Sequence, residues 1–95
     1  MPILHIDHKV RDFKAWKEAF DSDPAGREQG GVRRYQVFRS VDDPNYVMID
    51  LEFDSTKEAE AFQASLHELW GRVADKLGLE NAQARIIEKV ESKQF

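Results

Sequence analysis

The chain has 95 residues, of which 14 are basic and 18 acidic, giving a formal net charge of −4. This length accommodates a single core, and the absence of cysteine excludes disulfides, thiolate catalysis and cysteine–zinc sites. The acidic balance argues against nucleic acid as a partner, because backbone binding needs a concentrated positive surface. No apolar run approaches the ~20 residues of a membrane span, so we expect a cytoplasmic protein without membrane contact.

Residues 3–10 predict the first strand, because apolar side chains alternate along this segment. One face of the strand carries Leu4, Ile6, His8 and Val10. A helix is expected to follow, with Asp12 as its N-cap. Its apolar residues recur at helical spacing, and they are Phe13, Trp16 and Phe20. Pro24 disfavours helical geometry at the preceding residue, which predicts that the helix ends near Asp23.

Two further strands are predicted at residues 32–41 and 46–53. The first of them alternates imperfectly, whereas the second alternates cleanly. The apolar face of the second strand consists of Val47, Ile49, Leu51 and Phe53. Residues 42–45 are rich in turn formers, so the two strands should pair as a hairpin.

A second helix is expected to begin with a capping box, in which Ser55 is the N-cap and Glu58 stands three residues on. Gly78 predicts the end of this helix, and residues 82–90 predict a fourth strand. The apolar stripe of the helix comprises Ala59, Phe62, Leu66, Leu69, Trp70, Val73 and Leu77.

The element order is therefore strand, helix, strand, strand, helix, strand, all within one domain of residues 1–95. With right-handed crossovers this order gives an α+β ferredoxin-like fold, an antiparallel sheet in strand order 4-1-3-2 with two helices on one face. The other face would be semi-apolar, which suggests that something covers it, most simply a second copy of the chain. We place on this face the residues Ile3, Tyr35, Val37, Tyr46 and Met48.

Two phrases of the sequence carry a family resemblance over nearly the whole chain. One is His5-Ile6-Asp7-His8-Lys9-Val10 leading into Phe13 and Trp16, and the other is Phe53-Asp54-Ser55 opening a helix that holds Ala59 and Phe62. In these features the chain resembles the dimeric α+β barrel superfamily, and within it the antibiotic-biosynthesis monooxygenase-like group. The resemblance implies a homodimer with two sheets packed face to face, and a substrate pocket between sheet and helices in each protomer.

Members of this superfamily include cofactor-independent monooxygenases of aromatic polyketides, haem-degrading enzymes, lactone isomerases and dye-type peroxidases. The haem degraders use an Asn in the first strand and a Trp followed by a His in the second helical region. Here the nearest first-strand residue is Asp7, and no histidine follows Trp70. The resemblance therefore does not extend to haem degradation.

A metal site in the first strand is not expected. Successive strand residues point to opposite faces, so His5 and His8 cannot reach one ion from a regular strand. His5 and Asp7 share a face, but two ligands are too few for a site. No phosphate-binding glycine loop, serine elbow or zinc-protease motif is present either, and we predict neither a metal nor another cofactor.

His8 is the candidate catalytic residue. It lies among apolar residues on the face expected to meet the helices, and an imidazole that titrates near neutrality suits proton transfer. A buried imidazole also needs a hydrogen-bond partner. Two interpretations stay open, a proton-transferring group in a substrate pocket and a core histidine bonded to the protein.

The candidate substrate-binding residues are mainly aromatic. The two tryptophans lie on helical stripes, where such residues usually belong to the core, although two in so small a core favour an aromatic-lined cavity. The histidine of the second helix stands one position off the stripe, at the edge of a cleft or on a solvated flank. The set consists of Trp16, Phe38, His67 and Trp70.

Two functions are therefore kept. The first is a cofactor-independent monooxygenase or isomerase of a small aromatic or lactone compound, in which His8 moves a proton and the protein holds the deprotonated substrate. The second is a non-enzymatic dimeric module that binds a small molecule or a protein partner.

Overall fold

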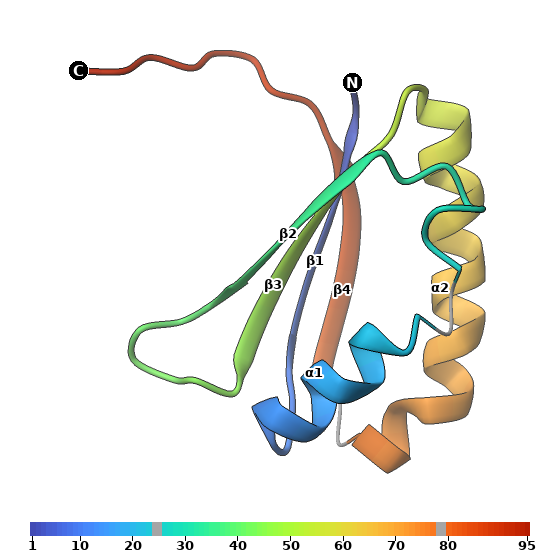
Figure 1. Ribbon diagram of the computed structural model, residues 1–95, viewed down its shortest axis with the longest axis vertical. Helices are drawn as coiled ribbons and strands as arrows, with labels where there is room; N and C mark the ends of the chain where they lie inside the picture. Colours follow the sequence, from blue (N-terminus) through green and yellow to red (C-terminus); the bar gives the residue numbers. More distant parts are fainter. Residues whose placement is uncertain (24–25, 78–79) are drawn as a thin grey trace.

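The computed structural model describes residues 1–23, 26–77 and 80–95. It contains the predicted elements in the predicted order. The fourth strand begins two residues earlier than predicted and ends three residues earlier, so Val90 lies outside the sheet in an exposed tail that leaves its edge (Figure 1). The elements are β1 (Ile3–Lys9), α1 (Phe13–Asp21), β2 (Arg34–Arg39), β3 (Tyr46–Glu52), α2 (Thr56–Leu77) and β4 (Glu80–Ile87).

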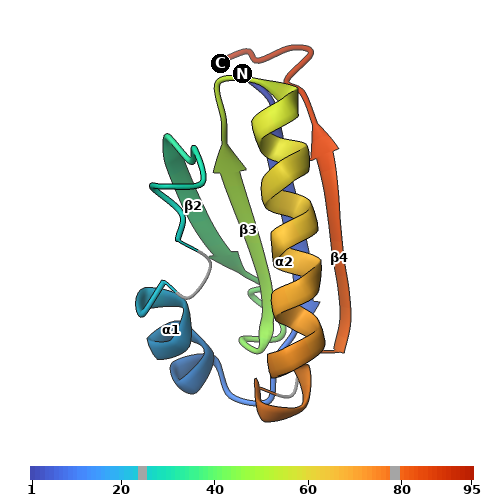
Figure 2. The ribbon, with the colours of Figure 1, turned by 90° about the vertical axis from the view of Figure 1, so that its right-hand side faces the viewer.

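The sheet is antiparallel throughout, with strand order β2-β3-β1-β4. Read from the other edge this is the predicted order 4-1-3-2, so the α+β ferredoxin-like fold is confirmed. Both helices lie on the same side of the sheet (Figure 1). Figure 2 looks onto this side: α2 runs the length of the sheet in front of β1, between β3 and β4, whereas the short α1 lies toward β2.

The core lies between the sheet and the helices, as the alternation of β1 and β3 predicted. Leu4, Val47 and Phe53 are fully buried there, and each such side chain stabilises the fold by roughly 1.5–3 kcal/mol. From α2, the ring of Phe62 packs 5.6 Å from that of Phe53. The predicted helix residues Val73 and Leu77 and the predicted stop Gly78 lie outside the residues or side chains that the structure describes.

The predicted face of β2 is wrong. Tyr35 pairs with Leu51 and Val37 with Ile49, so both share the helix-covered face rather than the open one. Phe38 pairs with Met48 on the open face and is 45 % exposed, so it does not line the space beneath the helices. The reason is that β2 carries apolar side chains on both of its faces, and only its pairing with β3 decides which face meets the core.

The two helices begin with different caps. The Ser55 hydroxyl accepts a hydrogen bond from the backbone N–H of Glu58 at 3.2 Å, which confirms the predicted N-cap. Asp12 occupies the N-cap position of α1, but its side chain makes no capping bond. The side-chain oxygen of Asn45, from the β2–β3 connection, accepts the Phe13 N–H instead at 3.0 Å. The start of α1 is therefore tied to the hairpin.

Candidate functional site

His8 lies near the end of β1 on the helix-covered face, as the alternation of the strand predicted. Only 2 % of its surface is exposed. In β3 its partner is Val47. On the other side the register with β4 shifts between Asp7 and Lys9, so His8 stands at a bulge of the sheet. Bulges locally bend a strand and re-aim a side chain, and they are frequent next to active sites.

The imidazole is enclosed by aromatic rings from both helices. The Trp16 ring of α1 lies 5.7 Å from the His8 ring, and the Trp70 ring of α2 lies 6.1 Å away, both in edge-to-face geometry. His67 is exposed, and its ring lies 5.5 Å from that of Trp70. Four of the five predicted site residues thus lie together, and Phe38, on the opposite face of the sheet, is the exception.

The His8 Nδ1 atom is buried and makes no hydrogen bond to any part of the chain that the structure describes. Burial lowers the pKa of His8 to about 4, although the charge of Asp7 acts in the opposite direction. The ring is therefore neutral at pH 7. An unsatisfied buried nitrogen costs about 1–3 kcal/mol, which a ligand that hydrogen-bonds to it would recover.

Aromatic rings continue from His8 along α1. Trp16 contacts Phe13 at 5.8 Å and stacks on Phe20 at 5.1 Å. At the end of this row the Arg39 guanidinium lies 4.5 Å from the centre of the Phe13 ring. The sequence alone does not place Arg39 on this side of the sheet, because both faces of β2 carry apolar residues. If Val37 is assigned to the core, Arg39, two residues further on, lies on the same face.

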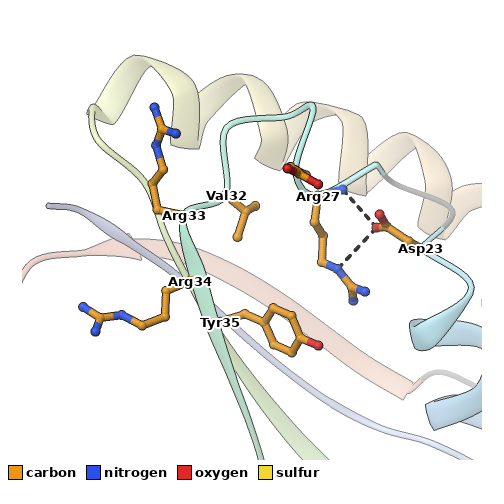
Figure 3. Close-up of a pocket in the computed structure, with 7 residues that line it drawn as sticks. Asp23, Arg27, Val32, Arg33, Arg34 and Tyr35 are labelled. Atoms are coloured by element: carbon orange, nitrogen blue, oxygen red, sulfur yellow. Dashed lines mark hydrogen bonds and ion pairs between the residues drawn. The ribbon is translucent and has the colours of Figure 1, made fainter.

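A separate surface pocket of about 270 Å³ lies where the loop after α1 meets β2 (Figure 3). Arg27 enters it between two rings, 3.9 Å from the centre of Phe20 and 4.8 Å from that of Tyr35. Asp23 pairs with this guanidinium at 3.3 Å. These opposite charges therefore satisfy one another. Its lining consists of Asp23, Arg27, Glu28, Val32, Arg33, Arg34 and Tyr35.

The open face of the sheet carries a chain of polar contacts at its centre. His5 Nδ1 lies 2.6 Å from an Asp50 oxygen, and His5 Nε2 lies 3.5 Å from Asp7. The Tyr46 hydroxyl donates to Asp7 at 2.9 Å, and this hydrogen bond raises the pKa of Tyr46. Apolar side chains of the same face surround the polar centre, and they are Ile3, Phe38, Met48 and Ile87.

Within residues 1–23, 26–77 and 80–95, no group of three or more histidine, aspartate or glutamate side chains is arranged to hold a metal ion. The helices in that part of the chain are also too short or too polar to cross a membrane.

No protein family model matches the sequence, and no curated protein matches it significantly. Solved structures match over nearly the whole chain. A candidate antibiotic biosynthesis monooxygenase from Nitrosomonas europaea is 21 % identical with a TM-score of 0.70, covering 96 % of this chain and all of its own. SnoaB, a cofactor-independent oxygenase from Streptomyces nogalater, is 13 % identical with a TM-score of 0.72, covering 96 % of this chain and 95 % of its own.

A third match is a candidate antibiotic biosynthesis monooxygenase from Bordetella bronchiseptica, which is 14 % identical with a TM-score of 0.72. It covers 95 % of this chain and 98 % of its own. At such identities the likeness concerns the fold and not the activity. The chain therefore has the ferredoxin-like fold of the antibiotic biosynthesis monooxygenase-like proteins, which is the fold that the two sequence phrases around His8 and Ser55 indicated.

Proposed function

We propose that the protein is a cofactor-independent monooxygenase that acts on a small electron-rich aromatic compound, with His8 as the proton-transferring residue. The observation that carries this proposal is the buried, neutral imidazole of His8, whose Nδ1 has no hydrogen-bond partner among the described residues and whose ring contacts Trp16 and Trp70 in edge-to-face geometry. The fold shared with SnoaB, a cofactor-independent oxygenase, adds support.

The proposed reaction begins with the loss of a proton from an acidic C–H or O–H group of the substrate to the neutral imidazole. The anion that forms beside His8 then favours the protonated ring, because an opposite charge raises the pKa that burial had lowered. Trp16, Trp70 and His67 would hold the aromatic body of the substrate near the imidazole.

The electron-rich anion can reduce molecular oxygen itself. A carbon–oxygen bond forms, His8 returns its proton to the peroxide, and the oxygen–oxygen bond breaks as the second hydrogen leaves the carbon. Overall a CH₂ group and O₂ become a carbonyl group and water, and the substrate supplies all four electrons. An isomerase would use the same first proton transfer without oxygen.

We further propose that the protein works as a homodimer joined through the open sheet face. The apolar side chains on this face, with Phe38 45 % and Ile87 39 % exposed, support the proposal. A stable interface of this kind buries on the order of 2,000 Å². The partially buried polar chain around His5 would then fix how the two sheets are aligned.

The proposal is tested with an oxygen electrode and a panel of anthrones, naphthols and lactones, each compared with its reaction rate in buffer alone. His8→Phe keeps approximately the bulk of the ring and removes the proton acceptor. We expect this variant still to bind ligand, more weakly by the lost hydrogen bond to Nδ1, and to lose about 10²-fold or more in turnover at saturating substrate, the usual contribution of a positioned acid or base. Val41→Asp, at a position that is 99 % exposed and outside the sheet, is the control.

Turnover that survives His8→Phe would contradict the assignment of His8. Specific binding of an aromatic compound without oxygen uptake or isomerisation in any member of the panel would favour the non-enzymatic module.

A further inference from the structure

The segment from Arg27 to Arg39 holds four arginines, and three of them have a carboxylate partner. Arg27 pairs with Asp23, Arg33 with Asp54 and Arg34 with Glu52. For Arg39 the structure, over the residues it describes, gives a ring contact with Phe13 and no carboxylate.

Arg39 also lies on the face of the sheet that carries His8. Arg39 pairs with Val47 in β3, and Val47 pairs with His8 in β1, so the three residues form one row across the sheet. Because neighbouring strands are about 4.8 Å apart, the backbones of His8 and Arg39 are separated by roughly 10 Å. A ligand that contacts both side chains therefore has to reach across about two strand spacings.

We propose that Arg39 recognises an anionic group of the substrate, so that the substrate class is an aromatic compound bearing a carboxylate or an equally acidic oxygen. The inference rests on the proposed function and names the substrate class of that same site. The anionic end would bind the guanidinium near the start of α1, and the reacting carbon would lie beside His8.

The chemistry of the guanidinium suits this role. It presents N–H groups in a planar fork that fits a carboxylate with two parallel hydrogen bonds. Its face is stacked on Phe13, which fixes the plane of the fork in advance and reduces the conformational freedom lost on binding. The backbone N–H of Phe13 donates a hydrogen bond to the side chain of Asn45, so the residue whose ring Arg39 stacks on is itself held in place.

The test compares naphthalene-2-carboxylate with naphthalene-2-carboxamide, two probes of nearly equal shape that differ in charge. Calorimetric titration of the parent protein should show the carboxylate binding about 10-fold or more tightly, as expected for a hydrogen-bonded charge. Arg39→Gln should abolish this preference and leave the affinity for the carboxamide unchanged, whereas Arg39→Lys should keep part of it. Arg33→Gln removes an arginine paired with Asp54 and should keep all of it.

The outcomes separate this inference from the proposed function. If the carboxamide binds and the carboxylate binds no better, or if Arg39→Gln retains the preference, the role of Arg39 is overturned while the aromatic site at His8 stands. If neither probe binds the parent protein, the role of Arg39 is overturned, and the oxygen-uptake assay decides separately whether the proposed function stands.

Discussion

His8 combines nearly complete burial with a titratable ring, and this combination links the stability of the fold to pH. Its pKa is lowered to about 4 in the folded protein, mainly by burial, from about 6.5 in an unfolded chain. Between these two values the unfolded chain binds a proton that the folded protein does not, so stability falls as the pH decreases from 6.5 to 4 and is fully present above 6.5.

The expected loss is about 2–3 kcal/mol at pH 4.5 relative to pH 7. Urea unfolding of the parent and of His8→Phe at both pH values measures it. The parent should lose that much more than the variant, which lacks the group and reports what the other ionisable side chains contribute. Equal losses in the two proteins would mean that His8 is protonated in the folded state at pH 4.5.

The alternation of side chains between the two faces of a strand explains which site residues could be predicted from the sequence. His8 lies in a strand that alternates cleanly, so its face follows from its neighbours Ile6 and Val10. Phe38 and Arg39 lie in a strand with apolar residues on both faces, and a shift of one residue exchanges the two sets. The same ambiguity placed Phe38 wrongly in the site and concealed Arg39.

At the scale of elements, local capping was predictable and long-range capping was not. Ser55 and Glu58 are three residues apart, so their pattern is visible in the sequence. The cap of α1 comes from Asn45, which is 32 residues from Phe13 along the chain. Asp12 has the right residue type at the right position, and yet its side chain makes no capping bond.

This difference between Asn45 and Asp12 predicts opposite results for two alanine substitutions. Asn45→Ala should cost about 0.5–2 kcal/mol of unfolding free energy, because the Phe13 N–H loses its acceptor. Asp12→Ala should change stability by less than about 0.5 kcal/mol. Chemical denaturation of the two variants measures both effects, and a larger loss for Asp12→Ala would show that Asp12 caps the helix in solution.

At the scale of the whole molecule, the strand order followed from the element order, since handedness leaves few topologies for such a chain. The sequence could not show what covers the open face, because the surface of a sheet does not specify which molecule binds to it. The structure does correct the composition of this face: Tyr35 and Val37 belong to the core side, and Phe38 replaces them.

A substitution on the open face therefore tests the proposed homodimer. Phe38→Asp places a charge on the proposed interface and should convert the dimer to a monomer at micromolar concentration, as measured by sedimentation. Val41→Asp is the control, because Val41 is 99 % exposed in the β2–β3 connection and outside the sheet. A parent protein that already sediments as a monomer would contradict the interface.

The central claim is that the unpartnered Nδ1 of His8 receives the acidic proton of an aromatic ligand. Nitrogen-15 NMR of the labelled imidazoles reports this directly, with signals assigned through His5→Phe, His8→Phe and His67→Phe. Without ligand at pH 7 His8 should be neutral. On titration with 2-naphthol we predict that its Nδ1 signal moves toward the protonated form while that of His5, on the opposite face, stays in place. Saturable binding of the naphthol that leaves the His8 signal unchanged would contradict the account.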